Sequence, residues 1–180
     1  MLLPLLRLRR SVRQFLPTPV AAADIEILRE AVLRSPSSRG RRPWEFVIVD
    51  DPELLVQLGA AKEHGSLFLA AAPLAVVVCA DPDKCDVWIE DSSIAAIILQ
   101  LTAESLGLGS CWAQMRLRPH GDGRTAEEYV KQLLGLPPRY RVDCVIGIGH
   151  PAKRSAGHAA ETLPWKQLHH NRFDPATAEN

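Results

Sequence analysis

The chain has no net charge, no paired cysteine motif and no long uninterrupted apolar run. Its 180 residues include 21 basic and 21 acidic side chains, which excludes a global electrostatic attraction to nucleic acid or to an acidic membrane. The longest apolar run, residues 67–80, contains Pro73 and is too short and too broken to cross a bilayer. The apolar residues at the N-terminus precede their charges, opposite to a secretion signal. These absences predict a cytoplasmic protein that binds neither nucleic acid nor membrane.

The four cysteines, Cys79, Cys85, Cys111 and Cys144, are scattered. Without C-x-x-C or paired Cys/His spacing, we expect reduced thiols, no metal site and no disulfide framework. The glycine-rich dinucleotide motif, the Walker A loop, H-E-x-x-H and G-x-S-x-G are also absent, which excludes the usual single-motif enzymes. At 47% hydrophobic and 23% charged residues, the chain is long and apolar enough for one domain with its own core.

Helical and strand patterns alternate irregularly, which predicts an α+β fold. The patterns predict helices over residues 2–10, 23–34, 52–61, 87–106 and 126–134, and strands over residues 44–49, 74–80, 110–115 and 142–148. In the long helix, the residues near one face are Ile94, Ile97, Ile98, Leu101 and Ser105. A helix this apolar is expected inside the protein or at a subunit interface. The last thirty residues lack periodicity and predict a tail that leans on another part of the structure.

Two segments in the first quarter of the chain carry residues suited to a ligand. Four arginines fall within residues 7–13, and their forked donors suit a phosphate or an anionic ring edge. Residues 35–44 form an arginine-rich loop in which two prolines fix the backbone and Gly40 allows close approach to a flat ligand. Taken singly, the first segment also fits a solvated basic face, and the second fits a surface turn.

Two later segments have the same ambiguity. Glycines within residues 107–116 place unhindered backbone beside Cys111 and Trp112, although both side chains also fit an ordinary core. Residues 147–154 end a strand in glycine and then present Lys153 and Arg154, which suit either a phosphate or solvent. The order and spacing of all four segments carry more information than any one of them.

In this order, the segments resemble the FMN-dependent nitroreductase family, specifically its small single-domain members. The resembling motifs are Arg9–Phe15, Ser35–Ser38 followed by Pro43–Phe46, Glu90-Asp91, Leu106–Trp112, Val145–Gly149 and His170–Phe173. The resemblance runs from about residue 5 to residue 173. It implies a mixed central sheet flanked by helices in an intertwined homodimer, with flavin sites at the interface. Residues 1–180 would form one flavin-binding domain whose C-terminal arm, about residues 160–180, is exchanged between subunits.

The resemblance also implies which residues bind the cofactor. Arg9, Arg10 and Ser11 would meet the FMN phosphate, and Arg13 would face the pyrimidine edge of the ring as an electrostatic stabiliser. The other implied contacts are Pro36, Ser37 and Ser38 from the second subunit, Gly40 in the same loop, Trp112, Gln114 and Met115 along the ring, and Lys153 or Arg154 at the phosphate. No side chain is required as a general acid.

The implied activity is that of an oxidoreductase in which NAD(P)H reduces FMN, which then reduces a nitroaromatic, a quinone or a similar small acceptor by a ping-pong mechanism. Residues 35–44, called the serine loop below, differ from the family pattern. Where family members commonly carry Asn and Gln, this chain has Gly40, Arg41 and Arg42. The added charge favours an acidic substrate or the phosphate of NADPH.

Three other interpretations stay open. The same scaffold could support reductive dehalogenation or flavin destruction. It could also bind flavin or sense a nucleotide with little turnover. A module that holds nucleic acid through its arginine segments is disfavoured, because the net charge is zero and interleaved aromatic residues are missing.

Overall fold

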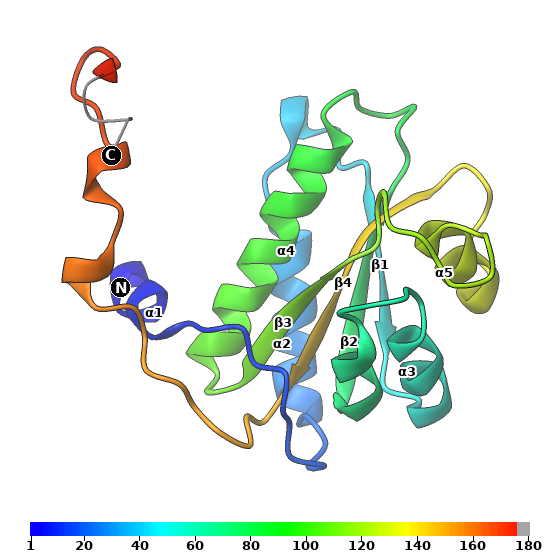
Figure 1. Ribbon diagram of the computed structural model, residues 1–180. Helices are drawn as coiled ribbons and strands as arrows, with labels where there is room; N and C mark the ends of the chain where they lie inside the picture. The colour runs from blue at the N-terminus through cyan, green and yellow to red at the C-terminus, as the bar shows by residue number, and fades with distance from the viewer. Residues whose placement is uncertain (176–180) are drawn as a thin grey trace.

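Four strands form one open sheet in the computed structural model, which describes residues 1–175 (Figure 1). They are β1 (Trp44–Val49), β2 (Leu74–Ala80), β3 (Gly109–Gln114) and β4 (Arg141–Gly149). Their order is β1-β2-β4-β3, and every neighbouring pair of these strands is antiparallel. β2 and β4 are therefore central, and β3 is an edge strand.

Helices cover both faces of the sheet (Figure 1). α2 (Ala22–Leu33) and α4 (Trp88–Ser105) pack on one face, while α3 (Pro52–Gly59) and α5 (Ala126–Leu134) pack on the other. β2 is buried along its whole length because both of its faces meet these apolar layers. The sheet and its helices thus enclose two apolar layers, one on each side.

The helix boundaries follow from local capping chemistry. The Asp51 carboxylate accepts two backbone N–H groups at the start of α3, where Pro52 is the first helical residue. Thr125 and Glu128 form a reciprocal capping box at the start of α5, and Gly135 ends that helix in the left-handed conformation. Such signals are local in sequence, so they set the ends of α3 and α5 without help from distant parts of the chain.

The α+β class and the flanking helices predicted from the sequence are confirmed. The predicted bounds of β1, β2 and α5 agree with the structure, and the other predicted helices and strands differ by at most two residues at either end.

The sequence pattern allows α4 to be buried inside the protein or to lie at a subunit interface, and the structure distinguishes its two sides. Ile94 and Ile97 are 40% and 38% exposed, whereas the side that meets the sheet carries Ala96, Leu99 and Ala103. Small alanines allow the helix axis to come close to the sheet, so the larger isoleucines remain outside. The outer side of α4 is consequently an apolar surface, which fits the alternative expectation of a subunit interface.

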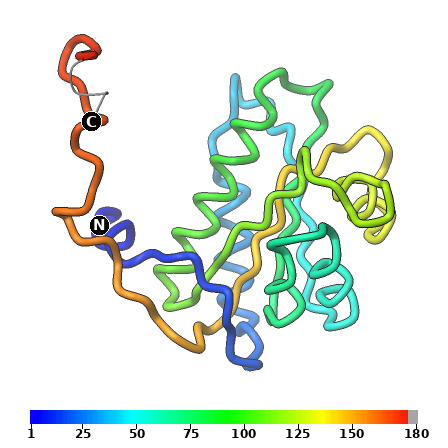
Figure 2. The backbone as a smooth tube through the Cα atoms, in the orientation of Figure 1, coloured from blue at the N-terminus to red at the C-terminus, as the bar shows by residue number. Residues whose placement is uncertain are grey.

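The two termini project together from the body of the protein (Figure 2). α1 (Leu2–Leu8) lies against the start of the C-terminal arm, where the Arg10 guanidinium donates to the Ala156 carbonyl at 2.6 Å. A Cβ on Gly157 would collide with the Arg7 carbonyl, so glycine permits this close approach. Of the predicted arm at residues 160–180, the last five residues lie outside the described part of the chain.

Apolar side chains are exposed on both projecting segments. They are Leu2, Leu3, Leu6 and Leu8 on α1, and Leu163, Trp165, Leu168 and Phe173 on the arm. Within residues 1–175, none of the helices has the length and hydropathy needed to cross a membrane.

Candidate functional site

The N-terminal arginine segment is held against the outer edge of β3. Ser11 forms a parallel bridge with Ser110, and the Val12 N–H donates to the Ser110 carbonyl at 2.9 Å. Gly109 makes room for this contact, because a Cβ there would lie 2.7 Å from the Val12 Cγ2 atom. Arg13 follows directly and is exposed, so its cationic side chain is presented beside the strand. This bridge is the one parallel pairing found among the described residues.

Beyond Ser110, β3 presents backbone N–H groups away from the sheet. The Met115 N–H donates to the Asp143 carbonyl of β4 at 3.0 Å, so the N–H of Met115 points toward β4. Successive residues of an antiparallel strand point their N–H groups to opposite sides, so those of Gln114 and Trp112 point to the outer edge. Of the three residues expected along a flavin ring, two therefore offer outward N–H donors, and Met115 offers a buried side chain.

Arg13 and Lys62 lie near Cys111 on β3, and Arg118 lies near Lys62. Burial raises the pKa of the Cys111 thiol, while the neighbouring Arg13 and Lys62 and a hydrogen bond with Ser11 act in the opposite direction. Burial, followed by the charge of Arg118, lowers the pKa of Lys62. Arg13, Lys62 and Arg118 thus make one edge of the site electropositive although the chain as a whole is neutral.

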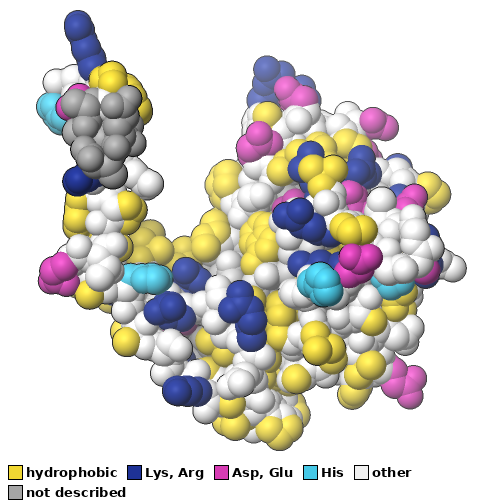
Figure 3. All heavy atoms as spheres, viewed as in Figure 1, with side chains coloured by type: hydrophobic (Ala, Val, Ile, Leu, Met, Phe, Trp, Pro, Cys, Tyr) yellow, Lys and Arg dark blue, Asp and Glu magenta, His cyan; other side chains and the backbone are white. Residues whose placement is uncertain are grey.

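Sequence reasoning missed Lys62 and Arg118. Lys62 lies in the turn after α3, and Arg118 lies in the excursion between β3 and α5. That excursion is anchored beside Lys62, since the His120 ring Nδ1 lies 3.1 Å from the Ala61 carbonyl oxygen. The proximity depends on tertiary contacts, and no local motif signals it. Figure 3 shows dark blue side chains beside the hollow between the projecting termini and the body of the protein.

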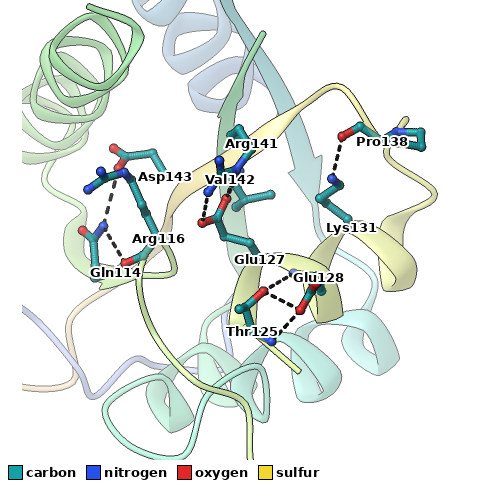
Figure 4. Close-up of polar contacts among 10 residues, drawn as sticks. All are labelled: Gln114, Arg116, Thr125, Glu127, Glu128, Lys131, Pro138, Arg141, Val142 and Asp143. Carbon is teal, nitrogen blue, oxygen red and sulfur yellow. Dashed lines mark hydrogen bonds and ion pairs between the residues drawn. The ribbon is translucent and has the colours of Figure 1, made fainter. Parts of the chain in front are cut away.

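A polar network backs the open edge of β3 (Figure 4). The Trp112 indole Nε1 donates to the Gln114 Oε1 at 2.8 Å, which directs the Gln114 amide nitrogen the other way. That nitrogen donates to the Arg116 carbonyl at 3.4 Å and to the Asp143 Oδ1 at 3.5 Å. The Arg116 guanidinium also lies 6.0 Å from the centre of the Trp88 ring. The orientation of the Gln114 side chain is therefore fixed by its neighbours.

The serine loop is attached to the N-terminal end of α4. The Asp91 carboxylate, 3% exposed in the first turn of α4, accepts the Ser38 N–H at 2.9 Å. Its other oxygen lies 3.5 Å from the Cys85 Sγ. The Ser37 hydroxyl accepts the Arg42 N–H at 2.9 Å, which folds the loop back on itself.

The same loop carries backbone strain. Arg39, Gly40 and Arg42 have φ values of 54°, 65° and 48°, in the left-handed region that favours glycine. Arg39 and Arg42 bear a conformational cost there, of the kind that clusters at ligand clamps. Pro36 and the three arginines of this loop are exposed.

One chain does not bring the serine loop to the N-terminal arginines. Ser110, which holds that segment, is bonded by Gln100 of α4 at 3.3 Å, whereas the loop is bonded by Asp91. Nine residues of helix separate Gln100 from Asp91, or about 13 Å along the helix axis. The two groups of candidate residues therefore occupy opposite ends of α4.

The candidates after β4 have different surroundings. The Arg154 guanidinium donates to the Glu104 carboxylate at 2.8 Å and to the Gly107 carbonyl at 2.6 Å, so it fastens the arm to the end of α4. Lys153 is exposed. Arg10 hydrogen-bonds to the C-terminal arm. Arg9, two residues before the Ser11 bridge to β3, is half-buried.

Comparison with known proteins identifies the family. The model of the nitroreductase family matches residues 6–64 and 60–150. The chain belongs to the nitroreductase family. The solved structure of an FMN-dependent nitroreductase from Clostridium difficile R20291 is 42% identical, with a TM-score of 0.93, and the similarity covers 95% of this chain and 99% of that one.

Curated members of the nitroreductase family agree with this assignment. A relative from Archaeoglobus fulgidus, provisionally named NADH dehydrogenase/NAD(P)H nitroreductase, is 33% identical over 93% of this chain and 90% of its own length. The FMN reductase [NAD(P)H] of Bacillus subtilis is 28% identical over 89% of this chain and 69% of its own length. The family resemblance stated from the sequence is thereby confirmed, and with it the nitroreductase fold.

Proposed function

We propose that this nitroreductase-family protein is an FMN-dependent oxidoreductase that uses NAD(P)H to reduce a nitroaromatic, a quinone or a similar small acceptor by a ping-pong mechanism. The observation that carries the proposal is the arginine segment docked on the open edge of β3. Phosphate-binding donors, outward backbone N–H groups and a cluster of cations meet at this edge. These are the groups that a flavin phosphate and the polar edge of its ring require.

The residues at this edge have separable roles in the proposal. Arg9 and Ser11 hold the phosphate, and Lys153 supplies a further cation, while Arg154 keeps the arm in place through Glu104. Bound FMN would supply the hydride chemistry at its N5 atom. Arg13, joined by Lys62 and Arg118, stabilises negative charge at the pyrimidine edge of the ring without transferring a proton.

The outward N–H groups of β3 orient the cofactor. The backbone N–H of Gln114 would donate to the ring edge. The Trp112 side chain, half-buried on the α4 side, would form an adjacent wall. Solvent supplies the proton that accompanies acceptor reduction.

A homodimer completes the site in this proposal. Pro36, Ser37 and Ser38, at the far end of α4, would reach the flavin bound by the second chain. The exposed Ile94 and Ile97 of α4 and the apolar arm would be covered by that chain. Sedimentation equilibrium tests this arrangement: twice the 19.8 kDa chain mass is expected, and a monomer at micromolar concentration would contradict it.

The decisive experiment is a visible spectrum of the purified protein after addition of FMN and desalting. Absorbance bands at about 450 and about 370 nm are expected to remain with the protein. Addition of NADH or NADPH without oxygen should bleach them, and a nitroaromatic or quinone should restore them. A protein that retains no flavin would refute the proposal, whereas one that binds flavin without turnover would favour a sensing role.

Arg9→Ala and Arg13→Ala test the assignment of residues, with Arg29→Ala as the matched control. Arg29 pairs with Glu26 on the exposed side of α2. We expect lower FMN retention in the first two variants and unchanged retention in the control. Equal retention in all three would remove these arginines from the site.

A further inference from the structure

Asp143 is an anomaly in the centre of the sheet. It lies on β4 between Val142 and Cys144, and it is 2% exposed. Its Oδ2 atom has no hydrogen-bond partner among the described residues. A buried carboxyl group in this state destabilises a fold, so its presence calls for a reason other than stability.

A β-bulge accounts for the direction of this side chain. In the pairing of β2 with β4, Val78 lies opposite Cys144 and Cys79 lies opposite Val142, so Asp143 is the extra residue. A bulge of this kind re-aims a side chain and is common beside active sites. Here it turns Asp143 toward Gln114 on the α4 side of the sheet, while Val142 packs in the apolar layer of α3 and α5.

Asp143 also holds the backbone of the segment that the proposed site uses. Its carbonyl oxygen accepts the N–H groups of both Met115 and Arg116, each at 3.0 Å. Its carboxylate accepts the side-chain amide of Gln114. One residue therefore contacts three consecutive residues at the end of β3. Figure 4 draws its contact with Gln114.

The carboxylate has few alternative partners. The Gln114 Oε1 is already occupied by the Trp112 indole, so only the amide nitrogen is free to meet Asp143. The charged groups that act on Asp143 are Arg116, whose cation attracts it, and Glu127, whose anion repels it. Burial raises the pKa of Asp143, and the Ser93 hydroxyl of α4, like Gln114, acts in the opposite direction.

We propose that Asp143 is a positioning residue for the flavin edge: its carboxylate fixes the Gln114 side chain and thereby the outward N–H of Gln114. The inference rests on the proposed function, since it assigns Gln114 to the flavin. It adds a residue that none of the binding motifs contains. It also gives a reason for the presence of a buried acidic residue in the largely apolar strand β4.

The test compares Asp143→Val and Asp143→Asn in the full-length protein reconstituted with FMN. Valine suits a buried central strand, so Asp143→Val should unfold at the same or a higher temperature than the wild type. Its FMN dissociation constant should nevertheless rise at least tenfold, with a shifted visible band. Asparagine keeps an oxygen acceptor for Gln114, so Asp143→Asn should bind FMN within threefold of the wild type.

Glu127→Ala is the matched control. Glu127, 5% exposed, accepts hydrogen bonds from the Arg141 guanidinium and the Val142 N–H, so its loss disturbs the same end of β4 without removing a contact to Gln114 (Figure 4). It should lower the unfolding temperature and leave the FMN affinity of the folded fraction unchanged. If Asp143→Val instead fails to fold or loses stability in the same way, the carboxylate is structural and the inference is overturned.

A double-mutant cycle with Gln114→Ala tests whether Asp143 acts through Gln114. In the Gln114→Ala background, Asp143→Val should change FMN affinity less than twofold, because the side chain to be positioned is gone. A further tenfold loss there would show an independent action and overturn the inference. Failure of the wild type to bind FMN would instead refute the proposed function, so the two failures are distinguishable.

Discussion

Gly109→Ala should separate the N-terminal arginines from β3 while leaving the core intact. A Cβ at this position would lie within 2.7–2.9 Å of three carbons of the Val12 side chain. Real Cβ atoms do not approach so closely, so either Val12 or the whole Ser11 bridge must move. Overpacking of this kind costs about 1–3 kcal/mol. Because Val12 belongs to the docked segment, we expect the cost to appear as displacement of that segment.

The free-energy cost of the displacement should appear as weaker FMN binding. If FMN binding must restore the native docking, a cost of about 1–3 kcal/mol weakens binding by about 5-fold to 150-fold. Fluorescence titration with FMN measures this change, and thermal unfolding of the apoprotein reports the accompanying loss of stability. Unchanged FMN affinity in Gly109→Ala would refute the reasoning, since it would show that the Ser11–Ser110 contact does not organise the site.

A compensating variant distinguishes steric displacement from an unrelated effect of alanine. Val12→Ala removes two of the three carbons that the new Cβ would meet and keeps the Val12 Cβ, 2.8 Å away, so the double variant Gly109→Ala/Val12→Ala should recover only part of the lost affinity. Val12→Ala alone is the control and should bind FMN nearly as well as the wild type. Additive losses in the double variant would mean that the two side chains do not compete for the same space.

Three further predictions concern other parts of the chain. Thr125→Ala removes the capping box of α5 and should lower the free energy of unfolding by about 1 kcal/mol, measured by urea denaturation. Hydrogen bonds from Arg124 lower the pKa of Asp122 to about 2, so Arg124→Gln should raise that pKa in an NMR titration. The stabilisation that these bonds provide is complete above the ordinary carboxyl pKa of 3.8 and is lost as the pH falls toward 2. Burial raises the pKa of Cys79 to about 12, and all four cysteines are buried, so thiol reagents at pH 8 should label only the unfolded protein.

The elements predicted most accurately from sequence are those whose signals are local. β2 is a continuous apolar run bounded by Pro73 and Asp81, and α5 carries both its cap and its terminating glycine. Each boundary is determined by residues within a few positions of it. The order of the strands has no such signal, because it depends on which strands pair across long separations in the chain.

The candidate site also combines residues with local sequence signals and residues brought in by tertiary contacts. The arginine segment and the serine loop are recognisable motifs, whereas Lys62 and Arg118 reach the site only because the turn after α3 lies beside the excursion that follows β3. The side of α4 that meets the sheet was not predictable from hydrophobicity alone, which ranks Ile above Ala for burial. The close approach of the helix to the sheet reverses that ranking, and it is a tertiary property.

The distribution of buried acids explains how a neutral chain can present a basic site. Asp91 accepts the N–H of Ser38, Glu104 binds Arg154, and Glu127 binds Arg141, so these carboxylates hold loops and segments in place from within the protein. The arginines of the β3 edge remain at the surface, where they keep their hydration until an anion binds.

Asp143 departs from this pattern, because one of its carboxylate oxygens has no partner among the described residues. Replacement of a paired buried acid leaves a loop or a cation without its partner, which costs stability. Replacement of Asp143 by an apolar residue instead removes a desolvated group that is poorly compensated. Opposite signs for the change in unfolding temperature in Glu127→Ala and Asp143→Val would therefore separate the acids that hold the scaffold from the one retained for the site.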